Sequence, residues 1–211
     1  MKNKRGLLLV VSGPSGAGKG TVCSEILRKH PEFFLSVSAT TRLPRPGEID
    51  GMNYYFITKE EFQDRIANDG FIEWAEFCGN FYGTPKASIE KLLAEGKDVI
   101  LEIEVQGALK VKEAFSEAIL FFVLPPSPEE LKKRLLGRGT ETEEVVNARL
   151  NQAMWELSQS PKYSYILLND EIDKAVERFE KAVETEKYAI ERNKDFTEMF
   201  SNELKKITDV K

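Results

Sequence analysis

The chain has 211 residues, which is enough for one domain with a sizeable core, and its net charge of -5 gives a pI near 5.3. This acidic balance argues against a broad face for nucleic acid or for a membrane surface. No apolar run approaches the roughly 20 residues of a membrane span, and no signal-peptide core precedes the first predicted strand. Two cysteines outside any CxxC pattern and one histidine cannot assemble a structural zinc site, so a reducing, cytoplasmic setting is expected.

The first predicted elements are a buried strand over 7–12, a glycine-rich turn and a helix over 19–29. Small residues in the turn let backbone N–H groups surround a polyphosphate, the helix adds its positive dipole end, and the lysine can reach the terminal phosphates. An ordinary strand-to-helix turn is the alternative. Ser or Thr usually follows that lysine to bind magnesium, and here a glycine does, so the hydroxyl that would meet the metal stays open. The expected loop residues are Gly13, Pro14, Ser15, Gly16, Ala17, Gly18, Lys19, Gly20 and Thr21.

Residues 36–88 carry aromatic residues on short strand-like pieces around one helix, which predicts an inserted β-rich lobe. The helix starts at a capping box over 58–61 and runs to about Asn68. We expect the aromatic residues of this stretch to form the small core of the lobe rather than a stacking surface. They are Tyr54, Tyr55, Phe56, Phe71, Trp74, Phe77, Phe81 and Tyr82.

Two features of the lobe suggest ligand contacts. The segment 36–48 is rich in hydroxyls and carries Arg42 and Arg45, whose planar guanidinium groups match phosphate oxygens, although an exposed loop with solvated arginines is the alternative. Glu73 lies between apolar residues, where an unpaired carboxylate is costly to desolvate. Guanine offers two adjacent donors, N1–H and the 2-amino group, which suit such a carboxylate. A side chain that points to water is the open alternative.

Later apolar runs at 99–103, 118–124 and 165–168 alternate with helical patterns at 106–115 and 129–136, which predicts a parallel sheet covered by helices on both faces. Ligands of such sheets gather at the carboxyl ends of the strands. Glu102 and Glu104 are expected there on the same side of the strand, where they could hold hydrated magnesium or bind a substrate. A cap of the following helix is the other interpretation of Glu104.

The polar stretch 137–142 joins two charged helices, 129–136 and 143–158, and could form a mobile lid. A stripe at positions 172–183 predicts a helix that covers the sheet. The two cysteines are expected to be packing residues, and His30 to cap the first helix. At the end of the chain, five apolar residues recur at helical spacing and predict a helix docked on the body, with a partner site or a frayed tail as alternatives. They are Phe196, Met199, Phe200, Leu204 and Ile207.

Together these segments resemble guanylate kinase in the same order over about residues 5–192, and the segments are 13–21, 36–48, 54, 71–74, 82–84, 102–107 and 134–144. The resemblance implies ATP-dependent phosphorylation of GMP or dGMP, as in purine nucleotide metabolism and GMP recycling, with Mg²⁺ as cofactor. It also implies a single guanylate-kinase-like domain with a core, a GMP-binding lobe, a lid and an extension. The core would span about 5–36 and 89–192, and the GMP-binding lobe about 37–88. The lid would span about 135–150, and the C-terminal extension about 193–211.

Roles carried over by position divide the site. Ser38, Arg42, Arg45, Tyr54 and Tyr82 would hold GMP, mostly its phosphate, and Glu73, Thr84 and Glu104 would read guanine. Residues 13–21 would hold ATP, with Asn169 near adenine, and Glu102 is a candidate near the metal. The groups that would stabilise the transferred phosphate are Lys19, Arg42, Arg134, Arg138 and Arg149. The rival hypotheses are a phosphopeptide-binding module without catalysis, a kinase of another nucleotide and a P-loop GTPase; the oligomeric state stays open.

Overall fold

The main body is a parallel sheet with strand order β2-β7-β1-β8-β9, in a computed structural model that describes residues 5–77, 79–137 and 143–208. The central strand β1 pairs in parallel with β7 and with β8. The predicted α/β class with a parallel sheet is therefore confirmed. The strands are β1 (Leu8–Ser12), β2 (Phe34–Leu35), β7 (Val99–Glu102), β8 (Ile119–Leu124) and β9 (Tyr165–Leu168).

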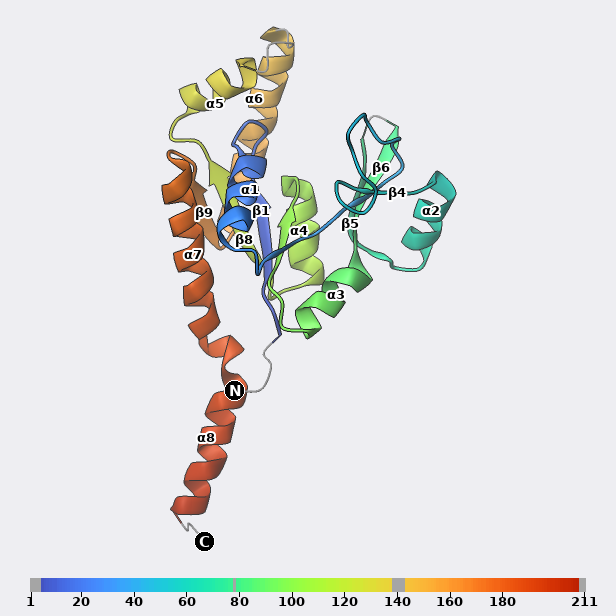
Figure 1. The fold of residues 1–211 in the computed structure, drawn as a ribbon. Helices are drawn as coiled ribbons and strands as arrows, with labels where there is room; N and C mark the ends of the chain where they lie inside the picture. Colours follow the sequence, from blue (N-terminus) through green and yellow to red (C-terminus); the bar gives the residue numbers. More distant parts are fainter. Residues whose placement is uncertain (1–4, 78, 138–142, 209–211) are drawn as a thin grey trace.

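Helices cover both faces of this sheet because side chains of its strands alternate between the faces (Figure 1). Leu9 and Val11 of β1 belong to the buried cluster that includes α1 and α7, whereas Leu8 and Val10 belong to the cluster that includes α3 and α4. Cys23 is a buried free thiol of the first cluster, as expected for a packing residue. The helices are α1 (Lys19–Lys29), α3 (Lys86–Ala94), α4 (Val105–Ala114) and α7 (Ile172–Tyr188).

Two helices begin at the side-chain caps that the sequence predicts. Thr58 accepts a hydrogen bond from the backbone N–H of Glu61 at 3.1 Å at the start of α2 (Lys59–Ala67). Ser127 accepts one from the N–H of Glu130 at 3.2 Å at the start of α5 (Pro128–Leu136). Such a cap contributes about 1 kcal/mol to stability, so the sequence around it determines where each helix starts.

The lobe carries a second sheet with strand order β4-β3-β6-β5 and one helix, α2, beside it (Figure 1). The antiparallel pair β5–β6 has an irregular register, because Phe71 faces Pro85 while Trp74 faces Gly83. Strand β5 thus holds one extra residue at this point, which is a β-bulge. The strands are β3 (Ala39–Thr40), β4 (Tyr55–Phe56), β5 (Phe71–Phe77) and β6 (Asn80–Pro85).

The aromatic core of the lobe is smaller than the sequence suggests. Phe62 stacks on Phe71 and Phe81, with ring centroids 4.3 and 5.4 Å apart. Phe71 and Phe81 therefore fulfil the prediction of a core role. Tyr55 and Trp74 contradict it, since they are 37% and 38% exposed.

Two further helices lie above the carboxyl edge of the main sheet, α5 and α6 (Glu143–Ser158) (Figure 1). They pack on each other through Leu131, Leu135, Val146 and Ala153. The core of the predicted lid, residues 138–142 with Arg138, lies outside the described residues. A short 3-10 helix, η1 (Ser160–Lys162), follows α6.

The end of the chain differs from the expectation. After α7, the 3-10 helix η2 (Ile190–Arg192) leads into α8 (Lys194–Ile207), which projects beyond the body (Figure 1). No residue of α8 is buried, so the prediction that this helix docks on the body is wrong. Among the described residues, no helix is both long and apolar enough to cross a membrane.

His30 ends α1 as its C-cap residue, as predicted, and its ring bridges two carboxylates. Nε2 lies 2.7 Å from Glu180 in α7 and Nδ1 lies 3.1 Å from Glu32. The hydrogen bond with Glu180 is the main reason why the pKa of His30 is raised. This contact between α1 and α7 therefore stabilises the fold most when His30 is protonated.

We expect His30→Gln to lower the free energy of unfolding by about 0.5 kcal/mol near pH 5.5, since the pair is partly exposed. A raised folded pKa stabilises the fold fully below the unfolded pKa of about 6.5, and this contribution disappears as pH rises through the folded value. Urea unfolding of both proteins near pH 5.5 and pH 8.5 measures the difference. An equal deficit at both pH values would contradict the charged contact.

Candidate phosphate-binding and nucleotide site

The glycine-rich loop joins β1 to α1 at the carboxyl edge of the main sheet. Gly13, Gly16 and Gly18 have positive φ values of 140°, 84° and 92°, which other residues rarely adopt. Gly18 is the N-cap residue of α1 and offers no side-chain cap. A Cβ atom at Gly18 would also lie 2.3 Å from Nδ2 of Asn169. The loop thus presents backbone N–H groups and the positive end of a helix dipole, which suits an anion.

Lys19 spans this loop. Its Nζ donates hydrogen bonds to the carbonyl oxygens of Gly13, at 2.6 Å, and of Pro14, at 3.2 Å. A lysine ammonium group has three donors, so two hold the loop and a third can meet a phosphate oxygen. The positive charge is therefore fixed at the mouth of the loop.

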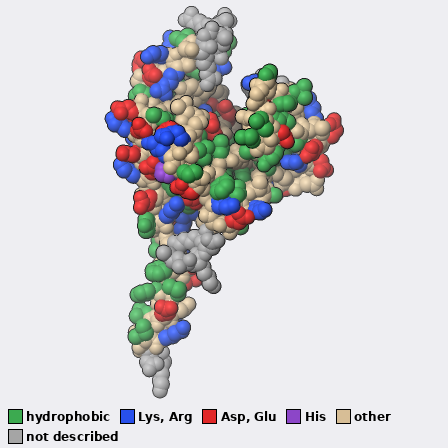
Figure 2. All heavy atoms as spheres, in the orientation of Figure 1, with side chains coloured by type: hydrophobic (Ala, Val, Ile, Leu, Met, Phe, Trp, Pro, Cys, Tyr) green, Lys and Arg blue, Asp and Glu red, His purple; other side chains and the backbone are tan. Residues whose placement is uncertain are grey.

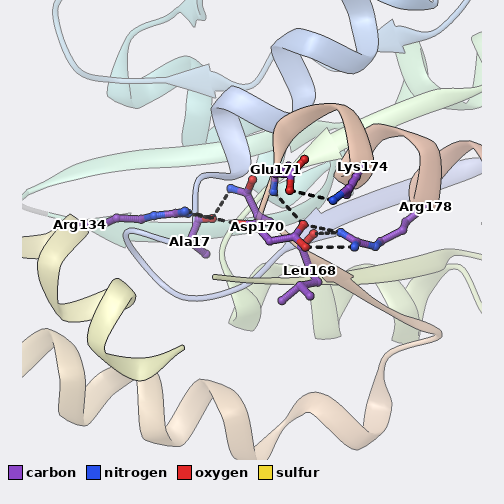
Figure 3. A network of polar contacts seen from close by, with 8 residues as sticks. Ala17, Arg134, Leu168, Asp170, Glu171, Lys174 and Arg178 are labelled. Atoms are coloured by element: carbon purple, nitrogen blue, oxygen red, sulfur yellow. Dashed lines mark hydrogen bonds and ion pairs between the residues drawn. The ribbon is translucent and has the colours of Figure 1, made fainter. Parts of the chain in front are cut away.

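Two side chains hold the loop at Ala17, Asn169 and Arg134. Figure 3 shows Arg134 reaching Ala17 from α5. The buried side chain of Asn169 donates to the carbonyl of Ala17 at 2.8 Å. Arg134 donates to the same carbonyl at 3.3 Å and to the carbonyl of Asn169 at 3.2 Å. Nε of Arg134 also donates to Glu130 at 2.9 Å. Asn169 thus serves the loop itself, and its predicted place near adenine stays a prediction.

The end of β9 beside this brace is held by Arg178 (Figure 3). Arg178 donates to the carbonyl of Leu168 at 2.7 Å and to both carboxylate oxygens of Asp170, at 2.6 and 3.2 Å. The guanidinium group holds the pKa of the Asp170 carboxyl far below its usual range. Asp170 and Arg178 fix the chain that presents Asn169, and neither was anticipated from the sequence.

Of the other two arginines outside the lobe that were predicted to contact the transferred phosphate, Arg149 belongs to the described residues and Arg138 does not. Arg149 in α6 approaches the loop, with its guanidinium 3.5 Å from Oγ of Ser15. Arg138 belongs to the residues outside the description. The structure therefore brings Arg134 and Arg149 to the phosphate loop from two different helices.

Glu102 lies at the end of β7, next to the start of α1. Its Oε1 lies 3.3 Å from the position that a Cβ atom at Gly20 would occupy, so the small residue after Lys19 leaves room for this carboxylate. Glu102 is reached by solvent, yet partial desolvation raises its pKa, with Lys19 opposing. A carboxylate oxygen in such a place is a ligand type that Mg²⁺ prefers, so the residues present fit a hydrated Mg²⁺ ion. Within the described ranges no group of three or more acidic, His or Cys side chains could hold a metal by itself.

Glu104 corrects one expectation. Strand β7 ends at Glu102, and Glu104 is the N-cap residue of α4, without a side-chain cap bond. The argument that both carboxylates share one side of a strand is therefore wrong. Glu156 of α6 was missed, although it is 3% exposed and burial, followed by the charge of Glu104, raises its pKa to about 7. A single charged residue in a helix gives no sequence signal of burial.

In the lobe, Arg42 is held in place by Glu48, whose role the sequence did not reveal. Two guanidinium nitrogens donate to the two carboxylate oxygens, both at 2.9 Å. Glu48 also accepts a bond from the backbone N–H of Arg45 at 2.6 Å. The Arg42 guanidinium lies over the ring of Tyr54, 5.4 Å from its centroid. The alternative of freely solvated arginines therefore fits Arg45, which is exposed, and not Arg42.

Tyr54 and Tyr82 stand beside this arginine. Their rings meet edge to face with centroids 6.1 Å apart, and burial raises the pKa of Tyr54. Ser38 is half-buried just before β3, where its carbonyl accepts the N–H of Tyr55 at 2.9 Å. The structure thus gathers Arg42, Tyr54 and Tyr82 in one corner of the lobe.

Glu73, which is half-buried, and Thr84 form a polar pair on the neighbouring strands β5 and β6. The Thr84 hydroxyl donates to Oε1 of Glu73 at 2.6 Å, and Thr84 is fully buried. The other oxygen, Oε2, lies 3.0 Å from the position of a Cβ at Gly107 in α4. Burial raises the pKa of Glu73, although Thr84 and Lys110 oppose the shift. The alternative in which Glu73 points into open water is therefore wrong.

We expect Glu48→Gln to raise the KM for the lobe's phosphate ligand roughly 5-fold, with a smaller change in kcat, because Arg42 loses one charged hydrogen-bond partner. Steady-state kinetics measures both constants. Glu61→Gln is the matched control, since Glu61 pairs with Arg65 on the exposed side of the lobe helix. Equal constants for Glu48→Gln and wild type would show that the Arg42–Glu48 pair does not set ligand binding.

The site thus has two halves, separated by a hollow between the main body and the lobe (Figure 2). One half is a phosphate loop with a lysine, and the other combines a positioned arginine with a desolvated carboxylate. Such an arrangement defines a P-loop nucleotide-binding protein with a second binding lobe.

Comparisons with known proteins identify the family. The sequence model of the guanylate kinase family matches residues 5–186. The chain is 55% identical over 194 residues to guanylate kinase of Clostridium perfringens (strain SM101), covering 92% of this chain and 90% of the relative. It is 53% identical over 192 residues to guanylate kinase of Desulfitobacterium hafniense (strain Y51), covering 91% and 96%. A crystal structure of guanylate kinase from Anaplasma phagocytophilum superposes with a TM-score of 0.70 at 34% identity, covering 88% of each chain. The chain belongs to the guanylate kinase family.

Proposed function

We propose that this protein transfers the γ-phosphoryl group of ATP to GMP, or to dGMP, to give ADP and GDP or dGDP. Membership of the guanylate kinase family supports this reaction. The observation that supports GMP as the acceptor is the Glu73–Thr84 pair. The Glu73 carboxylate is partly desolvated, so hydrogen bonds from a ligand would stabilise its charged form. The N1–H and 2-amino groups of guanine supply two adjacent donors, whereas adenine has an acceptor at N1.

ATP would occupy the phosphate loop, Gly13 to Thr21. The loop N–H groups would hold the phosphates and Lys19 would sit at the transferred group, while Asn169 and Arg134 keep the loop in shape. Arg149 already lies near Ser15 of the loop. Arg138 would join it when the lid closes, and closure would exclude water that could otherwise hydrolyse ATP.

GMP would bind in the lobe. Arg42, with Tyr54, Tyr82, Ser38 and Arg45, would hold its phosphate, and the Glu48 carboxylate keeps Arg42 aimed. Glu73 with Thr84 would read the guanine edge, and Glu104, at the start of α4, would assist.

The chemical step needs no protein nucleophile. An oxygen of the GMP phosphate would attack the γ-phosphorus, the bond to the bridging oxygen of ADP would break, and the new P–O bond would form in line. Lys19 and the arginines would neutralise the charge that spreads over the transferred group. Glu102 would help to hold a hydrated Mg²⁺ ion at this site, and the ion would supply further charge neutralisation. The buried free thiol of Cys23 supports our proposal of a reducing, cytosolic setting.

A coupled assay of ADP formation tests this function with ATP, Mg²⁺ and one monophosphate at a time. We expect turnover with GMP and dGMP and a preference over AMP, CMP and UMP. Equal rates with AMP would favour a kinase of another nucleotide, and hydrolysis of GTP without an acceptor would favour a GTPase. No turnover, combined with binding of a phosphopeptide, would favour the binding module.

A further inference from the structure

An exposed apolar stripe runs along α8, the helix that projects beyond the body. Figure 2 shows hydrophobic side chains gathered on this projecting segment. Five large apolar residues of the helix are between 48% and 79% exposed, and the rings of two of them, Phe196 and Phe200, lie 6.5 Å apart. The five are Phe196, Met199, Phe200, Leu204 and Ile207. One charged residue, Glu203, lies within the stripe, because it follows Phe196 by seven positions and so shares its side of the helix. An exposed apolar face of this kind on a helix is typical of an interaction site.

We propose that α8 pairs antiparallel with the α8 of a second copy of this chain, so that the protein forms a two-fold symmetric dimer. The pairing would bury the stripe of each helix against the stripe of the other, with Phe196 beside Ile207 of the second copy. These two residues are 11 positions apart, which is about three helical turns, so both face the same side of the helix. A two-fold axis at the middle of α8 brings each of them to the other.

The charges along one edge of the stripe favour this orientation. Asp195 and Lys206 are also 11 positions apart, so they lie on the same edge of the stripe. Met199, four positions after Asp195, belongs to this edge as well. In an antiparallel pair, Asp195 of each helix meets Lys206 of the other, which gives two ion pairs of opposite charge. In a parallel pair, Asp195 would instead face Asp195 of the second copy and Lys206 would face Lys206, so like charges would repel.

The same charges disfavour a membrane as the occupant. Helix α8 carries three lysines and three acidic residues, Lys194, Lys205 and Lys206 against Asp195, Glu198 and Glu203. A helix that lies on an anionic membrane surface carries an excess of Lys and Arg on its polar face. A second copy of α8 can pair with both the positive and the negative side chains, whereas an anionic membrane attracts only the positive ones.

The dimer is expected to be in equilibrium with the monomer. A helix of 14 residues is about 21 Å long, and a pair of such helices buries less than the roughly 1,600 Å² of a standard interface. A dissociation constant on the order of micromolar to tens of micromolar is therefore expected. Sedimentation of the full chain from about 1 to 500 µM should show the shift from monomer to dimer.

Two matched pairs of variants test the geometry. Phe200→Asp should abolish the dimer at all these concentrations. Lys205→Gln makes the same change in net charge on the far side of the helix and should leave the dimer intact. Asp195→Lys should raise the dissociation constant roughly 3- to 30-fold, since two attractive pairs become repulsive. Glu198→Lys is its control, because Glu198 lies two residues from both Phe196 and Phe200 and so faces away from the stripe.

The decisive variant is the double exchange Asp195→Lys with Lys206→Glu, which should restore the wild-type dissociation constant. Far-UV circular dichroism and kinase activity establish that every variant is folded. A wild type that stays monomeric at 500 µM would overturn the proposal, as would a double exchange no better than Asp195→Lys alone. Sedimentation of a monomeric wild type with phosphatidylserine vesicles would overturn it in favour of a membrane.

Discussion

Replacing Lys19 with alanine is expected to lower kcat by two or more orders of magnitude while it changes the affinity for GMP little. The ammonium group is held at the mouth of the phosphate loop by the carbonyls of Gly13 and Pro14. Its charge would be needed most when negative charge develops on the transferred phosphoryl group, and removal of one such electrostatic contact typically costs 10²–10³ in kcat. Steady-state kinetics gives kcat, and equilibrium titration with GMP gives the affinity of the lobe.

The matched control is Lys29→Ala in the same helix. Lys29 pairs with Asp173 on the surface and is not part of the loop. It should leave kcat unchanged. Because Lys19 also bridges the loop, ATP affinity should fall with kcat in Lys19→Ala, and a near-normal kcat would refute the assignment of Lys19 to the transferred group.

The second large effect concerns Glu73→Gln. We expect kcat/KM for GMP to fall by roughly 1.5–3 kcal/mol, or about 10- to 150-fold, because the amide loses the charge and one acceptor. The wild type should prefer GMP over AMP by a factor on the order of 10⁴ or more, as in sites whose buried polar groups stay unpaired with the wrong substrate. The variant should narrow this preference. The measurement is kcat/KM for both nucleotides in both proteins.

Glu76→Gln is the matched control, since Glu76 lies on the same strand but is exposed. It should leave both the efficiency and the preference unchanged. If Glu73→Gln retained the wild-type ratio of GMP to AMP efficiency, then the Glu73 carboxylate would not read the base.

Local signals in the sequence were sufficient for the parts of the fold that depend on neighbouring residues. The phosphate loop, the helix over 19–29 and the caps at Thr58 and Ser127 were all predicted because each is determined by residues within a few positions. Alternation of buried strands and helices was enough to predict the parallel sheet.

Features that depend on distant contacts were not predicted. A stripe at helical spacing shows that α8 has an apolar face but not what covers it, so the same pattern that correctly placed α7 on the sheet failed for α8. The two-residue strand β2 is too short to produce any periodicity. Strand β7 ends at Glu102, before Glu104. The alternation of apolar and polar residues cannot locate such a strand end, so the two carboxylates were wrongly placed on the same strand.

Within the site, the residue types were predicted better than their partners. Arg42 and Glu73 were selected because of their chemistry, whereas Glu48 and Thr84 hold them through contacts made by folding. The place of Asn169 shows the same limit, because its amide bonds to the loop across 152 residues of chain.

The extra residue in β5 has a consequence for how the lobe is attached. Phe71 pairs with Pro85 and Trp74 with Gly83, so Ile72 and Glu73 both stand opposite Thr84. In a regular strand two successive side chains point to opposite faces, but here Ile72 packs against the cluster of the main body while Glu73 approaches α4. The residue that packs the lobe against the main body, Ile72, and the residue that we propose to read the base, Glu73, are thus consecutive. A smaller side chain at Ile72 would therefore be expected to shift Glu73 and change nucleotide preference without touching the nucleotide.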